Sequence, residues 1–136
     1  MGKQENIAAQ IVFGTAVNTG DLDKIREVVA ADSVDHDPGD GQVPGPEGYI
    51  HFFTGFRAAF PDLHVELDHL VTDDDNVAFA YTVTGTHQGV LEGIPPTGKK
   101  IKVRGMQISR FENGKLVERW GSTDQLGILK QIGVIP

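Results

Sequence analysis

The sequence contains no cysteine, so disulfide bonds, thiolate nucleophiles and cysteine-based zinc sites are all excluded. It also lacks any run of about 18 to 20 apolar residues, the length that a membrane-spanning helix needs. The opening residues, MGKQENIAAQIVFG, do not join a basic end to an apolar stretch as an export signal does. We therefore expect a cytoplasmic protein that has no membrane partner.

Positive charge is scarce as well, because 12 lysines and arginines stand against 19 acidic residues and leave a net charge of −7. A chain of that charge repels nucleic-acid phosphates unless it carries a basic face. The one basic run, GKKIKVR, would place Lys100, Lys102 and Arg104 on one side of a strand. We interpret that side as a solvent or interface surface and expect no nucleic-acid partner.

The stretch GIPPTGKK, residues 93–100, spaces its glycines and lysine as a phosphate-binding loop does. However, Pro95 and Pro96 have no N–H to offer a phosphate, and Lys100 stands where magnesium needs a serine or threonine. The residues that follow alternate like a strand instead of opening a helix. A nucleotide site is therefore not expected here.

Helical periodicity dominates the first sixty residues. Helices are predicted over residues 6–17, over 22–30 after an Asp21 cap, and from Pro46 to the residues before Pro61. The segment between the second and third helices is predicted to be a loop. The first helix would bury the stripe Ile7, Ala8, Ile11, Val12 and Thr15, and the third would carry a stripe sized for a pocket wall: Tyr49, Phe52, Phe53 and Phe56.

From Leu63 onward the apolar period changes to two, which indicates strands. Strands are predicted over 63–72, with Leu63, Val65, Leu67, His69 and Val71 on one face, over 77–87, and on either side of the turn in RFENGKL. A bulged turn closed by Gly114 would pair Phe111 with Lys115, Gln107 with Arg119 and Gly105 with Gly121. A last helix in STDQLGILKQIG would begin with a capping box of Ser122 and Gln125.

Helices followed by a run of antiparallel strands, with no βαβ alternation, predict an α+β fold in which helices pack on one face of a curved sheet. At 136 residues the chain is expected to form one domain, residues 1–136, that can bury about two-thirds of its unfolded surface.

Five histidines show no metal-binding pair, and the acidic loop DHDPGDG lacks calcium-binding spacing, so no metal or other cofactor is expected. No serine has an obvious histidine partner. Acid/base chemistry in a pocket remains. The strand face of Val103, Gly105 and Gln107, with Arg119 opposite, turns from apolar to polar and would suit such a pocket, or else would form a surface pair.

The stretches VDHDP, GPEGYIHFF and FRAAFPDL, together with GTHQGVLEGIPPTGKKIKVRGMQISRFENGKLVERWGSTDQLGILKQIG, resemble the SnoaL-like polyketide cyclases and predicted ester cyclases of the nuclear transport factor 2-like superfamily. The resemblance implies a cone-shaped curved antiparallel sheet with three N-terminal helices on its concave face and a short C-terminal helix. It implies that GIPPTGK is a connection between strands. It further implies a homodimer whose pocket admits a small, flat hydrophobic ligand.

The resemblance also implies a cofactor-independent intramolecular aldol cyclisation with an aspartate as acid/base and an assisting histidine. Those two positions fall on Gly121 and Gln107 in this sequence. We therefore expect Asp124 and His36 to be the catalytic groups, in a pocket formed by Phe53, Phe56, Val103, Gly105, Gln107, Arg119 and Gly121. Alternative functions are a non-catalytic binding module of the same fold, and an isomerase or hydrolase outside polyketide chemistry.

Overall fold

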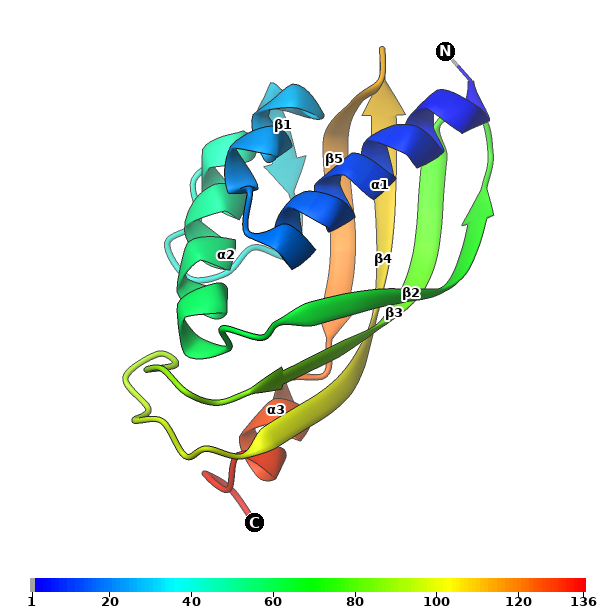
Figure 1. Ribbon diagram of the computed structural model, residues 1–136. Coiled ribbons are helices and arrows are strands. Elements are labelled where there is room, and N and C mark those ends of the chain that lie inside the picture. Colours follow the sequence, from blue (N-terminus) through cyan, green and yellow to red (C-terminus); the bar gives the residue numbers. More distant parts are fainter. Residues whose placement is uncertain (1) are drawn as a thin grey trace.

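The structure, a computed structural model, describes residues 2–136 and combines helices with a single five-stranded sheet (Figure 1). Its elements follow in this order: α1 (Lys3–Thr19), the 3-10 helix η1 (Leu22–Glu27), β1 (Val29–Asp35), α2 (Pro46–Ala59), β2 (His64–Thr72), β3 (Asn76–Thr86), β4 (Lys100–Glu112), β5 (Lys115–Thr123) and α3 (Gln125–Gln131). Within the described residues, no helix is both long and apolar enough to cross a membrane. The predicted α+β class is confirmed.

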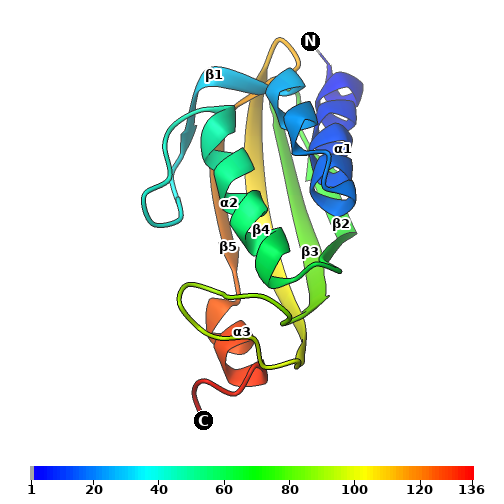
Figure 2. The ribbon, with the colours of Figure 1, turned by 60° about the vertical axis from the view of Figure 1, so that its left-hand side comes forward.

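The strand order is β1-β5-β4-β3-β2, and the sheet is curved and not closed. β2 to β5 pair antiparallel, whereas β1 pairs with β5 in parallel. Helices α1 and α2 lie across the concave face, and α3 lies at the end of the sheet beside the loop between β3 and β4 (Figures 1 and 2). This arrangement is the predicted cone with helices on its concave face.

Strand β1 is the element that the sequence analysis missed, because residues 22–30 are predicted to be a helix and the residues after them a loop. The chain instead makes one 3-10 segment and then turns into a strand at Val29. Val29 pairs with Leu116 and Asp35 with Arg119, both more than eighty residues away. Local periodicity carries no record of such a distant partner.

The buried face of α1 also differs from the predicted stripe. Ile11 is 55% exposed, whereas the polar residues Asn6 and Gln10 are buried beside Phe13. The Asn6 amide donates to the carbonyl of Asp74 at 2.9 Å, and Gln10 lines the cavity described below. The inner face of α1 therefore carries two polar side chains, one bonded to a carbonyl and the other placed at the cavity.

Strand β2 contains a bulge between Leu67 and His69, which ends the predicted alternation. After a bulge the side chains switch faces. Leu70 accordingly packs on the core, and Val71 is exposed.

The hairpin between β4 and β5 has a two-residue turn, because Asn113 and Gly114 both adopt positive φ, at 52° and 74°. Glu112 pairs with Lys115, and a bulge follows between Arg110 and Phe111. The predicted pairing is therefore wrong by one residue at Phe111, which faces Leu116, and by two residues beyond the bulge. Gln107 faces Gly121, Ser109 faces Arg119 and Gly105 faces Thr123. An even shift keeps each side chain on its predicted face.

The sequence also predicts that Phe53 or Phe56, Val103 and Trp120 are substantially buried. The structure agrees with this prediction on the concave side and contradicts it at Trp120. Val103 is buried, and Phe53 and Phe56 are partly buried against the core. Trp120 is 37% exposed because it follows Arg119 in β5 and so points to the convex face. No helix begins at Lys99; the next residue opens β4, as expected.

Candidate active site

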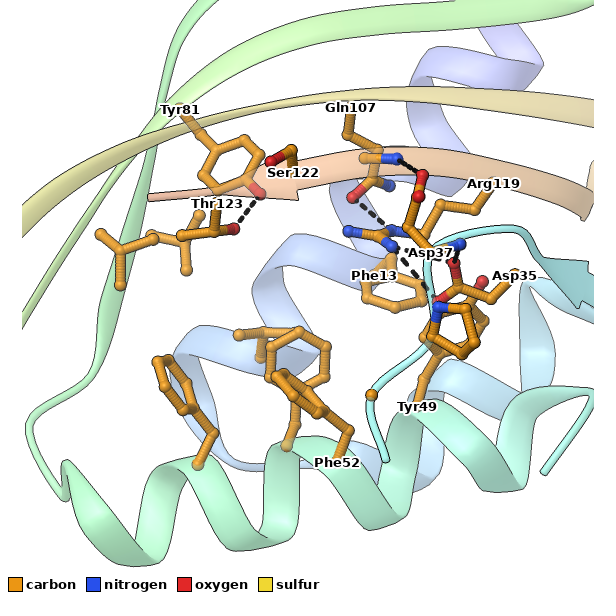
Figure 3. Close-up of a pocket in the computed structure, with 18 of the residues that line it drawn as sticks. Phe13, Asp35, Asp37, Tyr49, Phe52, Tyr81, Gln107, Arg119, Ser122 and Thr123 are labelled. Carbon is orange, nitrogen blue, oxygen red and sulfur yellow. Dashed lines mark hydrogen bonds and ion pairs between the residues drawn. The ribbon is translucent and has the colours of Figure 1, made fainter. Parts of the chain in front are cut away.

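A cavity of about 520 Å³ lies between the concave face of the sheet and helices α1 and α2 (Figure 3). Most of its wall is apolar and aromatic, as the stripe of α2 predicts. The apolar lining residues are Phe13, Val17, Phe52, Phe53, Phe56, Val65, Phe79, Val83 and Ile128. Such a wall suits a flat hydrophobic molecule.

One end of the cavity is polar and is organised around Arg119 of β5 (Figure 3). Its Nη1 donates to Asp35 Oδ1 and Oδ2 at 3.0 and 3.2 Å, and its Nε donates to Gln107 Oε1 at 2.8 Å. The Gln107 amide in turn donates to Ser109 Oγ at 2.9 Å. The Arg119 side chain is only 16% exposed, so its guanidinium is held in one orientation on two sides.

Asp35 ends β1 and is the buried partner of this ion pair, with a side chain 7% exposed. Besides Arg119, its carboxylate accepts from the Gln42 amide at 3.0 Å and from the backbone N–H of Asp37 at 2.9 Å. Gln42 Oε1 accepts from the N–H of Gly39 at 2.9 Å. These bonds tie the loop after β1 to the cavity.

Asp37 lies in the same loop and contacts the backbone of β5. The backbone N–H of Gly121 donates to Asp37 Oδ2 at 2.9 Å. A side chain at Gly121 would require Arg119 to shift, because a Cβ there would lie 2.6 Å from Arg119 Nη2. A carboxylate thus lies beside residue 121 although that residue carries none.

Two tyrosines add hydroxyl groups to the lining. The Tyr81 hydroxyl and Thr123 Oγ1 are 2.6 Å apart. Tyr49 is buried, and its burial, together with the nearby Asp35 carboxylate, raises the pKa of its hydroxyl well above the ordinary value. Tyr49 therefore stays neutral and able to donate a hydrogen bond at physiological pH.

The structure brings together most of the predicted pocket. Phe53, Phe56, Gln107, Arg119 and Gly121 line the cavity. Val103 and Gly105 are buried on the same face of β4 but do not line it. The Tyr81 ring covers Gly105, where a Cβ would overlap Tyr81 Cζ. The predicted lining at these two positions is therefore corrected.

The two predicted catalytic groups lie elsewhere. Asp124 caps α3, accepting from the N–H of Gly127 at 2.8 Å, so the predicted capping box at Ser122 is wrong. His36 stacks on Trp120 with ring centres 4.8 Å apart, and its Nε2 lies 2.8 Å from Glu118 Oε2, a bond that lowers the pKa of Glu118. Neither residue lines the cavity. Their catalytic roles stay predictions.

Sequence reasoning missed several lining residues, namely Gln10, Asp35, Asp37, Gln42, Tyr81 and Thr123. For Asp35 and Asp37 the sequence did contain a signal. The stretch DHDP that holds them follows a short run with β-branched residues, which favours a strand. Within residues 2–136 no three histidine, aspartate or glutamate side chains cluster closely enough to share a metal ion.

A curved sheet and the helices on its concave face surround a cavity that is mostly aromatic and is polar at one end, an arrangement that suits a small-molecule ligand. The family model of the SnoaL-like polyketide cyclases matches residues 8–132, and the chain belongs to that family. Its relatives include the aklanonic acid methyl ester cyclase of Streptomyces peucetius, 27% identical over 87% of this chain and 83% of that protein. The nogalonic acid methyl ester cyclase of Streptomyces nogalater is also 27% identical, over 88% and 90%.

Solved structures agree with this membership. IdmH of Streptomyces antibioticus is 32% identical and superimposes with a TM-score of 0.83, over 94% of this chain and 98% of that one. The fold of the present chain is therefore the SnoaL-like fold.

Proposed function

We propose that this protein is a cyclase that closes a ring in a polyketide-derived ester by intramolecular aldol addition. The relatives that are named as cyclases act on methyl esters of aklanonic and nogalonic acid. A methyl ester carries at least one carbonyl group, and the family resemblance implies a flat hydrophobic ligand. The cavity offers matching surfaces, with an aromatic wall for the rings and a polar end for the carbonyl groups.

The observation that carries the proposal is the set of titratable side chains in the cavity. Asp35, Asp37, Tyr49, Tyr81 and Arg119 all line it. A non-catalytic binding module needs hydrogen-bond donors and acceptors but no group that exchanges protons with its ligand. A carboxylate close to an arginine is the equipment for removing a proton beside a carbonyl group and stabilising the enolate that forms. This pairing favours an enzyme over the binding module.

The direct test is to incubate the purified protein with aklanonic acid methyl ester and follow the cyclised isomer by chromatography and mass spectrometry. A cavity-blocking variant, Val65→Trp, supplies the negative arm, since Val65 lines the cavity. Val71→Trp is its matched control, because Val71 lies on the same strand and is exposed to solvent. Turnover by the natural protein and Val71→Trp, with loss in Val65→Trp, supports the proposal. No turnover by the natural protein contradicts it.

A homodimer that meets through the convex face of the sheet is part of the proposal. This face exposes Met106 at 67%, together with Ile108 and Trp120, beside the charged Arg104 and Arg110. Exposed methionine, tryptophan and arginine are typical of protein interfaces. Sedimentation should give a dimer at micromolar concentration, and Met106→Glu should weaken it at least about tenfold. A monomeric natural protein would contradict this assembly.

The cytoplasmic location stays a prediction, which cell fractionation would check.

A further inference from the structure

We propose that Asp37 is the catalytic base of this site and that Arg119 Nη2 stabilises the negative oxygen of the enolate; this inference rests on the proposed aldol chemistry. Of the described residues that line the cavity, two carry carboxylates, Asp35 and Asp37. A carboxylate can take a proton from a substrate only if one of its oxygens is not already occupied by hydrogen bonds within the protein.

Asp35 is fully engaged in holding the site together. Both of its oxygens accept from Arg119, and they also accept from the Gln42 amide and the backbone N–H of Asp37. Its side chain is only 7% exposed, so little of it is open to a ligand although the residue lines the cavity. Protonating Asp35 would leave the Arg119 charge without its partner in a poorly solvated place. Asp35 is a positioning residue.

Asp37 is held at one oxygen and open at the other. Its Oδ2 accepts from the N–H of Gly121, whereas its Oδ1 accepts no hydrogen bond from residues 2–136. The residue is exposed and lies at the polar end of the cavity (Figure 3). One fixed oxygen sets the orientation of the carboxylate, and the open oxygen can approach a carbon-bound proton of a ligand.

Arg119 is likewise fixed by some of its atoms and open at another. Its Nε and Nη1 are bonded to Gln107 and Asp35, whereas its Nη2 meets no acceptor among the described residues. The Cβ position of Gly121 lies 2.6 Å from this Nη2, so both functional atoms flank residue 121. A side chain at position 121 would displace the guanidinium. The glycine thus allows the carboxylate and the free N–H donor to share one site.

The chemistry balances with these two groups. Asp37 Oδ1 takes a proton from the carbon beside a substrate carbonyl, so that the C–H bond breaks and its electron pair forms the enolate. Arg119 Nη2 donates to the enolate oxygen. The enolate carbon then attacks a second carbonyl carbon of the same molecule, which forms the C–C bond. The resulting alkoxide takes back the proton from the Asp37 carboxylic acid, and no oxidant or reductant is needed.

The test compares Asp37→Asn with Asp40→Asn. Both remove one negative charge from the same loop, and Asp40 is exposed and does not line the cavity. In Asp37→Asn the new amide oxygen can still accept from the N–H of Gly121, so the loop is expected to stay in place. General base catalysis contributes about 10²- to 10⁴-fold. We expect kcat for aklanonic acid methyl ester to fall at least about 100-fold in Asp37→Asn and to stay within about twofold in Asp40→Asn, with binding of the cyclised ester unchanged in both.

A second readout separates this inference from the proposed function. In D₂O the natural protein should speed deuterium uptake at the acidic carbon of the ester, and Asp37→Asn should not. If both proteins cyclise and exchange equally, Asp37 is not the base, although the cyclase function stands. If Asp37→Asn loses binding as well as turnover, Asp37 is a binding residue and the inference fails. If the natural protein neither cyclises nor exchanges, the proposed function and the base both fall.

Discussion

Arg119 and Arg110 each bind a carboxylate, but they do so on opposite faces of the same sheet. Arg119 faces the cavity, where it and Asp35 are 16% and 7% exposed. Arg110 faces outward, where it contacts Glu112 and Glu118 with a third of its own side chain exposed. Water and salt screen the inner pair much less than the outer pairs. The same kind of pair, an arginine with a carboxylate, therefore holds a site together on one face and lies at the solvent surface on the other.

The largest expected effect comes from removing each arginine in turn. Arg119→Met leaves the buried Asp35 charge unpaired, which should lower the free energy of unfolding by about 3–5 kcal/mol. Arg110→Met removes exposed pairs and should cost about 0–1 kcal/mol. Urea denaturation followed by circular dichroism measures both. Equal losses would show that the two faces do not differ as described.

A smaller effect is expected at Gly121, on the concave face. Gly121→Ala places a Cβ 2.6 Å from Arg119 Nη2, so the guanidinium must shift. We expect a loss of about 1–3 kcal/mol in stability, with a fall in cyclisation rate. Gly55→Ala is the control, because Gly55 lies within α2 with open space around it and should gain about 0.5–1 kcal/mol. A neutral Gly121→Ala would mean that Arg119 moves without cost.

The cavity should also respond to alkaline pH through Tyr49. Burial raises the pKa of Tyr49 in the folded state, so the folded protein keeps this proton at pH values where the unfolded chain loses it. The natural protein should therefore lose stability as pH rises past about 10, the ordinary tyrosine value. Tyr49→Phe lacks this contribution and should lose less. Urea midpoints at about pH 8 and about pH 10.5, on either side of that value, give the comparison, and parallel losses in the two proteins would contradict it.

The smallest effects are expected at the two catalytic candidates that the sequence suggested. Asp124→Asn keeps a good helix cap, and His36→Asn changes a residue on the convex face. Both variants should cyclise within about twofold of the natural rate and differ in stability by less than about 0.5 kcal/mol. A loss of rate of about tenfold in either, equivalent to about 1.4 kcal/mol, would restore that residue as a catalytic group and would argue against Asp37.

Much of the fold could be predicted because it depends on residue patterns that are local in the sequence. Pro46 and Pro61 frame α2, and the period of four aromatics there predicted the cavity wall. The change of period near Leu63 predicted the strands that follow. Errors arose where the chain departs from regular geometry by one residue, as at the bulge between Leu67 and His69. A bulge leaves no periodic signal.

The candidate site was predictable in part for the same reason. Gln107 and Arg119 were placed in the pocket because strand alternation puts both on the inner face, and a register error of two residues did not change that face. Asp35 and Asp37 were missed because β1 pairs with a strand far along the chain, and nothing local identifies that pairing.

The sequence by itself determined the helix boundaries of α2, the alternation of β3, β4 and β5, and the family, since each depends on residue types at short spacing. Only the tertiary structure decided which side chains meet. The long loop after β1 brings the Asp37 carboxylate to the backbone of Gly121, and a residue without a side chain leaves room there for Arg119. Contacts of that kind depend on the path of the chain through space, which spacing along the sequence does not specify.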